Sequence, residues 1–322
     1  MSQPDDLPEA QPAPVADAVR GNWVDRLAPE FARPYLRLSR ADRPIGTWLL
    51  LLPCWWGVAL AAARDGWRTH DLWIIAGCAA GAWLMRGAGC TWNDITDRDF
   101  DAAVARTRSR PIPSGQVTVR QALIWMAAQM ALAGLVLLTF NLVTILLALS
   151  SLGLVAIYPY AKRFTWWPQL FLGSAFNWGA PVAYAAHAGW PDAPVWVLYA
   201  AGIAWTLFYD TIYAHQDKED DVLIGVRSTA RLFGAATSKW LALFMVVTVT
   251  LMAAAILAAL LPTAGGVKLA LALAAPWFLG WHLLWQLGRL DIDDPAGCLR
   301  LFRTNRDAGL IPALFLAAAA FL

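Results

Sequence analysis

Long apolar runs recur along the 322-residue chain, with short polar segments between them. A helix needs about 20 consecutive apolar residues to cross a bilayer. The pattern therefore predicts nine transmembrane helices, of which the last is short. They cover residues 44–63, 71–92, 119–138, 142–160, 168–187, 194–213, 240–261, 267–287 and 308–322.

The composition supports a membrane protein. Hydrophobic residues make up 59% of the chain and charged residues 15%, and the mean hydropathy is +0.48. Such values exclude an ordinary soluble domain. We expect an all-α, polytopic protein whose surroundings are the lipid bilayer. Nucleic acid is not an expected partner, and the sequence names no protein partner.

The basic residues predict how the chain is oriented. If the N-terminus is cytoplasmic, twenty arginines and lysines fall on the cytoplasmic side, whereas the opposite loops hold only Arg64, Arg68 and Lys268. This bias is the positive-inside pattern. The C-terminus is then expected on the outer side of the membrane.

The first 35 residues differ from the rest of the chain. They are rich in Pro, Ala and acidic residues, which predicts a disordered tail leading into a short amphipathic segment, followed by one transmembrane domain over residues 36–322. Mitochondrial transit peptides are poor in acids, but this segment contains Asp5, Asp6 and Glu9. No cleavable signal is evident either. We therefore expect the inner (cytoplasmic) membrane of a bacterium.

Two aspartate pairs carry the candidate chemistry. Asp97 and Asp101 are four residues apart, and so are Asp217 and Asp221, 120 residues further on. This spacing places both carboxylates of a pair on one face of a helix. The segments 93–101 and 210–221 thus look like two copies of one metal-binding motif. Stacked carboxylates repel each other, and their natural partner is a hard divalent cation. We expect Mg²⁺ bound to phosphate oxygens.

The helical wheel adds three residues to these pairs. Arg86, Asn93, Asp97 and Asp101 lie on one narrow stripe at about 100° per residue. An arginine within a membrane span is costly and by default indicates a functional cavity, although Arg86 could also reach the cytoplasmic interface. Asp210 has the same spacing to Asp217 and Asp221. Asp99 and Glu219 fall on the outer face and are excluded from the site.

Basic and phenolic residues complete the inventory. Tyr158 and Lys162 share a helical face, and Arg163 follows directly. Four aspartates and a diphosphate ester bring about seven negative charges, of which two Mg²⁺ neutralise about four, so the remainder calls for Lys162, Arg163 and an arginine such as Arg110. Without a diphosphate, membrane anchoring explains the cations equally well.

The motifs in their order resemble the UbiA superfamily of intramembrane prenyltransferases, over residue 36 to the end. Within it, the chain is most similar to members that prenylate 4-hydroxybenzoate. The matching stretches are Arg43-Pro-Ile-Gly46, Met85-Arg86-Gly-Ala-Gly-Cys90, Asn93-Asp-x2-Asp97-x3-Asp101, Arg106-Thr-Arg108-Ser-Arg110-Pro-Ile-Pro-Ser-Gly115, Tyr158-Pro-Tyr-x-Lys162-Arg163, Tyr209-Asp210-Thr-Ile-Tyr213-Ala-x-Gln-Asp217-x-Glu-Asp-Asp221, Gly225-Val-x-Ser228-Thr229 and Phe302-Arg-x-Asn305-Arg-Asp307.

This resemblance implies nine helices around a central cavity, capped by the two acidic helix-loop segments on the cytoplasmic side, and a role in ubiquinone synthesis. The substrates would be polyprenyl diphosphate and 4-hydroxybenzoate, and the product 3-polyprenyl-4-hydroxybenzoate. The expected ligands of Mg²⁺ are Asn93, Asp97, Asp101, Asp217 and Asp221. The expected substrate-binding residues are Arg43, Arg86, Arg110, Tyr158, Lys162, Arg163 and Tyr213.

Roles within this site follow from the chemistry of the side chains. Arg86 or Arg43 would clamp the benzoate carboxylate, since a guanidinium matches it in bidentate fashion. Arg86 is preferred because it lies deeper. Asp210 would orient the phenol or accept a proton.

Two other functions remain open. A related enzyme acting on homogentisate, haem or chlorophyllide would keep the metal site and change the aromatic pocket. A cation-coupled transporter would also use intramembrane acids and a duplicated half, but its acids would lie near the bilayer midplane. A soluble prenyl synthase is excluded by the nine apolar spans.

Overall fold

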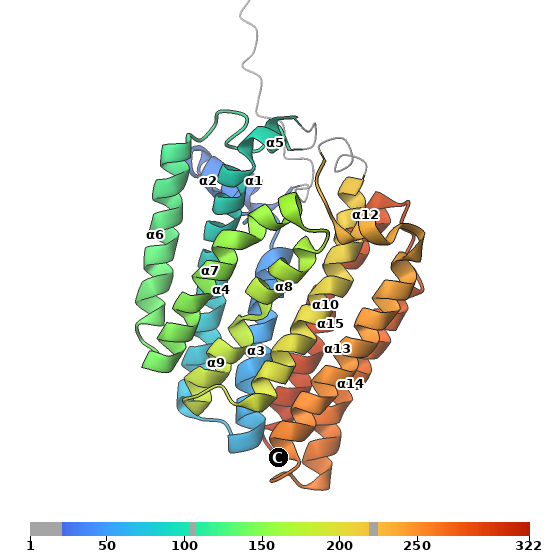
Figure 1. Ribbon diagram of the computed structural model, residues 1–322. Coiled ribbons are helices and arrows are strands. Elements are labelled where there is room, and N and C mark those ends of the chain that lie inside the picture. The colour runs from blue at the N-terminus through green and yellow to red at the C-terminus, as the bar shows by residue number, and fades with distance from the viewer. Residues whose placement is uncertain (1–20, 104–106, 219–224) are drawn as a thin grey trace, which may run out of the picture. The chain divides into compact units, whose positions relative to one another are not determined.

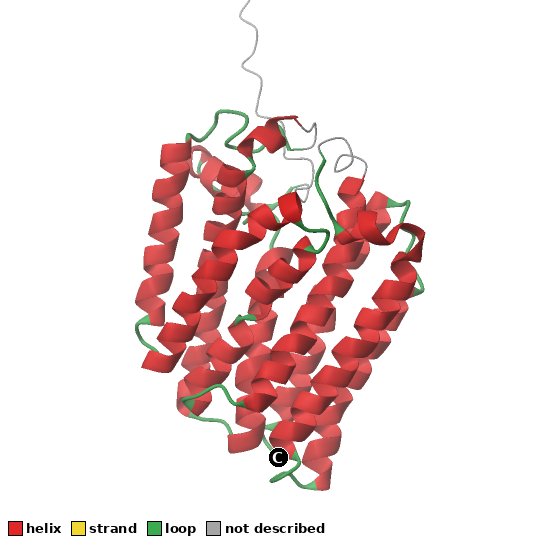
Figure 2. Ribbon diagram, in the orientation of Figure 1, coloured by secondary structure: helices red, strands yellow, loops and turns green. Residues whose placement is uncertain are grey.

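The computed structural model describes residues 21–103, 107–218 and 225–322 (Figure 1). These residues form helices and no strand (Figure 2), which confirms the all-α prediction. The chain divides into two compact units, one of residues 1–43 with 87–127 and a larger one of residues 44–86 with 128–322. Helices α4 (Thr69–Thr96) and α6 (Val119–Leu137) contribute residues to both units.

The remaining elements fall within single units. The smaller unit contains α1 (Trp23–Leu27), η1 (Glu30–Ala32), α2 (Arg33–Leu38) and α5 (Arg98–Ala103). The larger unit contains α3 (Ile45–Asp65), α7 (Leu142–Phe164), α8 (Pro168–Asn177), α9 (Gly179–Ala188), α10 (Ala193–Ala214), η2 (His215–Asp217), α12 (Thr229–Phe233), η3 (Gly234–Ala236), α13 (Thr237–Leu260), α14 (Gly266–Leu287) and α15 (Pro295–Ala319).

Seven helical segments of the described chain are long and apolar enough to cross a membrane. They are Ile45–Asp65, Thr69–Thr96, Val119–Leu137, Leu142–Phe164, Ala193–Ala214, Thr229–Leu260 and Gly266–Leu287. The expected count of nine is therefore not reproduced as nine continuous spans. The two that differ are the fifth and the ninth.

Local chemistry explains both differences. The fifth span is divided at Trp178 into α8 and α9. Pro181 contributes to the break, because it has no N–H to donate to the carbonyl of Asn177 and its ring crowds that carbonyl. The ninth span, α15, is long enough, but every stretch of 18 residues within it contains Arg303, Arg306 and Asp307.

Helices α3 and α10 are central in the larger unit. Two thirds of the most apolar part of each is buried, whereas in α7 only 11% is buried. Their largest buried side chains, Trp56 on α3 and Trp205 and Tyr209 on α10, belong to the main hydrophobic core. The hydrophobic residues that α7 exposes therefore suit contact with lipid.

A glycine allows α3 to touch α9. A Cβ at Gly57 would lie 2.2 Å from the backbone oxygen of Ala180, a distance at which no side chain fits. Small residues at helix crossings allow such close approach in membrane proteins. The position of α9 beside α3 thus depends on the missing side chain.

Candidate active site

The first acidic segment joins α4 to α5 in the smaller unit. The N–H of Asp97 donates to the carbonyl of Asn93 (2.9 Å), and the N–H of Asp101 donates to the carbonyl of Asp97 (2.8 Å). The i, i+4 spacing of the predicted stripe therefore persists across the junction between the two helices. Asp97 is 1% exposed and Asp101 7%, whereas the side chain of Asp99 is 88% exposed, as the helical wheel predicts.

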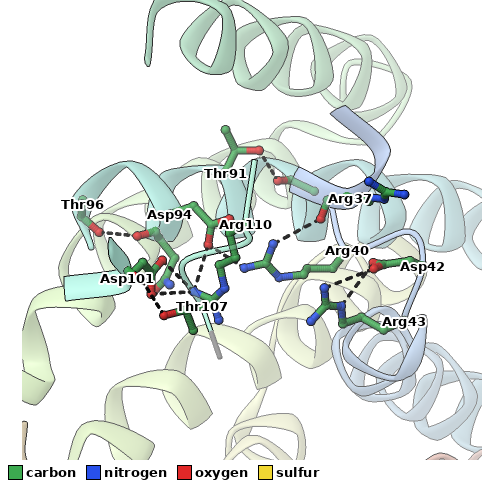
Figure 3. Close-up of polar contacts among 12 residues, drawn as sticks. Arg37, Arg40, Asp42, Arg43, Thr91, Asp94, Thr96, Asp101, Thr107 and Arg110 are labelled. Carbon is green, nitrogen blue, oxygen red and sulfur yellow. Dashed lines mark hydrogen bonds and ion pairs between the residues drawn. The ribbon is translucent and has the colours of Figure 1, made fainter. Parts of the chain in front are cut away.

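A chain of ion pairs runs through this segment (Figure 3). Arg40 Nη2 lies 2.6 Å from Asp94 Oδ1, and Arg110 Nη1 lies 3.4 Å from the same oxygen. Arg110 Nη1 also donates to both oxygens of Asp101, at 2.9 and 2.8 Å. Two arginines thus face two buried carboxylates, and Arg110 connects them.

Arg40 reaches this cluster from an unusual backbone conformation. Its φ is +58°, in the left-handed region that favours glycine. It follows the end of α2, where the N–H of Ala41 donates to Leu36 O (2.9 Å) and closes the helix in a Schellman-like turn. A non-glycine residue here costs on the order of 1–2 kcal/mol, and the ion pair with Asp94 offsets this cost.

The acidic cluster also affects the proton affinity of its members. The pKa of the Asp101 carboxyl is raised, mainly because burial disfavours the charged form. Arg110 opposes this shift, while the charges of Asp94 and Asp97 add to it. A further cation beside Asp97 and Asp101 would relieve the same repulsion.

The donor set suits a hard cation with few protein ligands. Within the described residues, no group of three or more His, Cys, Asp or Glu side chains is arranged to hold a metal. Mg²⁺ commonly uses only one or two carboxylates, with substrate phosphates and water completing its shell. Asp97 and Asp101 fit that requirement, with the half-buried Asn93 four residues before Asp97.

The second acidic segment belongs to the larger unit and departs from the predicted geometry. Helix α10 ends at Ala214, and the N–H of His215 bonds to the carbonyl of Ile212, three residues back. This tightening to a 3₁₀ turn means that Asp210 and Asp217 do not lie on one continuous α-helix. Asp210 is half-buried, and the backbone of Asp217 ends η2. Asp221 lies outside the described residues.

Tyr213 and the end of α7 lie in the same unit. The ring of Tyr213 packs against Phe302, with centroids 4.5 Å apart. Tyr158 and Lys162 are half-buried on α7. Arg163 is exposed and stacks over Tyr160 at 5.0 Å, so it points to the outer surface of the helix.

The loop after the second acidic segment is tied to α7. The N–H of Arg227 donates to Lys162 O (3.1 Å), and its guanidinium donates to Phe164 O (2.8 Å). Ser228 then caps α12. These bonds hold Arg227 and the start of α12 close to Lys162, the predicted diphosphate-binding lysine.

Arg43 and Arg86, the two residues predicted to bind the benzoate carboxylate, differ in the contacts that their guanidinium groups already make. Arg43 binds both oxygens of its neighbour Asp42, at 3.2 and 3.1 Å. Arg86 on α4 lies against Gly46 of α3 and over the ring of Phe176 at 5.4 Å, and its buried Nε has no hydrogen-bond partner. A buried guanidinium donor without an acceptor is costly, so Arg86 is the better placed of the two for an anionic ligand.

Sequence reasoning missed two members of the ion-pair chain, Arg40 and Asp94. Asp94 lies seven residues before Asp101, a spacing that places both on one side of a helix, and this signal could have found it. Arg40 carried no such signal, because its partner lies 54 residues away.

Fold and site together define a class: multi-pass helical membrane proteins with buried carboxylates and arginines at helix ends. The UbiA prenyltransferase family model matches residues 50–317. The chain therefore belongs to the UbiA prenyltransferase family, and it is an enzyme of the prenyl-transferring kind.

Sequence similarity to named proteins covers most of the chain. It is 47% identical to "4-hydroxybenzoate polyprenyltransferase, mitochondrial" of Drosophila melanogaster over 87% of this chain and 69% of the relative. It is 48% identical to the Bos taurus protein of the same name over 88% of this chain and 74% of the relative.

Solved structures show the same fold. A UbiA homolog from Aeropyrum pernix K1 has a TM-score of 0.62 and 25% identity, covering 85% of this chain and 96% of its own. A UbiA homolog from Archaeoglobus fulgidus bound to GPP and Mg²⁺ has a TM-score of 0.65 and 22% identity, covering 89% of this chain and 98% of its own.

One prediction is corrected by these relatives. Their names place them in mitochondria of eukaryotes, so the expectation of a bacterial cytoplasmic membrane is wrong. That expectation rested on Asp5, Asp6 and Glu9, which lie outside the matched residues 50–317. Acidic residues there do not determine which membrane holds the family domain. The multi-pass character of the chain is unaffected.

Proposed function

We propose that this enzyme transfers a polyprenyl chain from polyprenyl diphosphate to C3 of 4-hydroxybenzoate, with release of diphosphate, as a step of ubiquinone biosynthesis. The main support for the acceptor is the 47–48% identity to enzymes named for this reaction, extending over nearly nine tenths of the chain. The main support for the reaction is the buried carboxylate cluster of the first acidic segment.

The donor diphosphate is assigned to the acidic segments. Asp97 and Asp101, assisted by Asn93, and the second pair Asp217 and Asp221 would hold Mg²⁺. When bound, the metal would neutralise the charge that develops on the leaving diphosphate. Asp97 supports this role because its carboxylate is buried, where charge interactions are strong.

The cations near these segments take up the remaining charge. Lys162 is half-buried and its backbone is bonded to the loop that follows the second acidic segment. Arg110 holds Asp101 and would contribute its charge to the diphosphate if that carboxylate serves as a metal ligand. Arg163, which is exposed over Tyr160, would contribute its charge from the rim.

The acceptor is assigned to Arg86 and its neighbours. The unpartnered Nε of Arg86 would donate to the benzoate carboxylate, with Phe176 beneath the guanidinium. Asp210 would orient the phenol or take the proton released from C3 after attack on the allylic carbon. Tyr158 and Tyr213 would line the pocket, and Arg43, engaged by Asp42, would act from the edge. Exclusion of water by these side chains prevents capture of the allylic cation.

We further propose nine membrane crossings around a central cavity. Helices α8 and α9 would form one broken crossing, which is tolerated where the freed backbone groups are buried in protein. Asn177 at this break is buried and donates to Gly173 O and Thr206 Oγ1, both at 2.8 Å. The second half of α15 would provide the last crossing.

The test is an assay of the purified protein with polyprenyl diphosphate and 4-hydroxybenzoate, with product identified by mass. We expect prenylated product with Mg²⁺ and none with excess chelator. Asp97→Ala should abolish turnover, whereas Asp99→Ala, altered two residues away on the exposed face, should retain most of it. Prenylation of homogentisate in preference to 4-hydroxybenzoate would refute the acceptor assignment.

A further inference from the structure

Two amide side chains form a buried pair between α14 and α15. Gln286 and Asn305 are both 0% exposed. Gln286 Nε2 donates to Asn305 Oδ1 and Asn305 Nδ2 donates to Gln286 Oε1, both at 3.2 Å. A polar pair in an otherwise apolar core is less favourable than leucine packing unless every group is bonded. Its presence here indicates a need for a defined orientation.

The orientation of Asn305 is fixed by its neighbours. Its Nδ2 also donates to the carbonyls of Leu301 (3.3 Å) and Phe302 (3.2 Å) on its own helix. Its Oδ1 therefore faces away from these carbonyls and accepts a hydrogen bond from Trp205 Nε1 at 3.1 Å. Because an indole N–H can only donate, this bond requires an acceptor at position 305.

The ring of Trp205 is confined on its other sides as well. One turn after Asn305, a Cβ at Gly309 would lie 2.7 Å from the Trp205 ring, so α15 presses its backbone against the indole. Trp56 packs on the same ring with centroids 4.9 Å apart, and its own Nε1 donates to Gly309 O (2.7 Å). Trp205 thus has one available position.

Trp205 in turn supports Tyr209. The two rings are one turn apart on α10 and meet edge to face at 4.9 Å. Tyr209 is 1% exposed, and its hydroxyl accepts a hydrogen bond from Thr206 Oγ1 at 3.1 Å. Thr206 Oγ1 also accepts a hydrogen bond from Asn177 Nδ2 at 2.8 Å, and Asn177 directly follows Phe176, whose ring lies beneath the Arg86 guanidinium. Asp210 directly follows Tyr209 in the chain. Arg86 and Asp210 are the two residues assigned above to the aromatic acceptor.

We propose that Asn305 is a positioning residue for the acceptor half of the active site. Held by Gln286, it fixes Trp205, and through Trp205 it fixes Tyr209 beside Arg86 and Asp210. This inference rests on the proposed function, because it assigns Asn305 to the aromatic acceptor and not to the diphosphate. It assigns a role to Asn305, the buried asparagine of the Phe302-Arg-x-Asn305-Arg-Asp307 motif.

The test compares the two substrates in Asn305→Ala. Misplacing a binding group by about 1 Å costs up to about 100-fold in rate, so we expect kcat/KM for the acceptor to fall about 10- to 100-fold. The KM for polyprenyl diphosphate should stay unchanged. Trp205→Phe keeps the aromatic ring and removes the indole N–H, and it should give a smaller loss of the same kind.

A double variant tests whether Asn305 acts through Trp205. If Asn305 acts through the indole N–H, the loss of acceptor kcat/KM in Asn305→Ala combined with Trp205→Phe should be no larger than in Asn305→Ala alone. Thr248→Ala is the control for a buried polar group, because that hydroxyl donates to Phe244 O of its own helix. It should lower thermal stability without separating the two KM values.

Several outcomes overturn the proposal. These are equal losses for both substrates, additive losses in the double variant, or no effect of Asn305→Ala. If Asn305→Ala does not fold, Trp205→Phe provides the test. A selective loss of kcat/KM for the acceptor in Trp205→Phe supports the role of the bond between Trp205 and Asn305. A Trp205→Phe variant without this loss refutes the proposal. An inactive wild type with 4-hydroxybenzoate would refute the proposed function instead, and the comparison is then made with whichever aromatic acceptor the wild type prenylates.

Discussion

The ion pair between Arg40 and Asp94 makes a quantitative prediction. Asp94 is fully buried and Arg40 is 7% exposed, so water screens the pair very little. Asp94→Ala leaves the Arg40 guanidinium buried without its main counter-charge, a change that costs about 3–5 kcal/mol in comparable cases. It also removes the contact that offsets the left-handed backbone of Arg40. We therefore expect a large loss of stability.

Thermal unfolding of the purified protein in detergent measures this loss. With an unfolding entropy of about 2.1 cal/mol/K per residue, a chain of 322 residues loses about 1.5 °C per kcal/mol, so the midpoint should fall by roughly 4–7 °C. Asp94→Asn keeps one oxygen to accept from Arg40 and should lose less. Asp99→Ala, whose side chain is exposed and pairs with the adjacent Arg98, should melt like the wild type.

A double variant shows whether the stranded charge is the cause. Arg40→Gly removes the guanidinium and also suits the positive φ at this position. Combined with Asp94→Ala, it should melt at a higher temperature than Asp94→Ala alone. If Asp94→Ala melts like the wild type, or if the two losses simply add, the pair does not stabilise this unit in the way we describe.

Three further outcomes are expected. Arg86→Gln should raise the KM for 4-hydroxybenzoate about tenfold or more, since a charge-assisted hydrogen bond contributes about 1.5–3 kcal/mol, and leave the KM for the diphosphate unchanged in steady-state assays. Gly57→Ala should cost about 1–3 kcal/mol in thermal unfolding because its Cβ meets the Ala180 carbonyl, whereas Gly81→Ala, with open space around it, should not. Chelator should stop turnover until Mg²⁺ is restored, and Asp217→Ala should not recover at any Mg²⁺ concentration.

Hydropathy alone predicted most of the fold, because membrane helices are long and uniformly apolar. The first expected span, 44–63, corresponds to α3 (Ile45–Asp65), and the eighth, 267–287, to α14 (Gly266–Leu287). The fifth span could not be resolved this way, since residues 168–187 are mostly apolar and hydropathy does not mark a break among them. Pro181 cannot make one backbone hydrogen bond there. Pro53 in α3 and Pro276 in α14 lack the same bond within continuous helices, so a proline alone does not predict a break.

The helical wheel predicted less of the site. It separated the buried Asp101 from the exposed Asp99 because both lie on a short, regular stretch of helix. It failed beyond Ala214, where α10 tightens into a 3₁₀ turn and the angle per residue changes. A wheel describes neighbours on one element, so it could not pair Arg40 with Asp94 or Asn305 with Trp205.

The ion-pair chain explains how the two buried acids Asp94 and Asp101 can lie close together before any substrate arrives. Arg40 belongs mainly to Asp94, at 2.6 Å, while Arg110 is shared between Asp94 and Asp101. In the proposed function Asp101 would serve as a metal ligand, so Arg110 is the arginine whose charge would become available to the diphosphate. Asp94 then keeps Arg40 throughout, and the helix end that carries Asp97 and Asp101 stays in position while the charges beside it are exchanged.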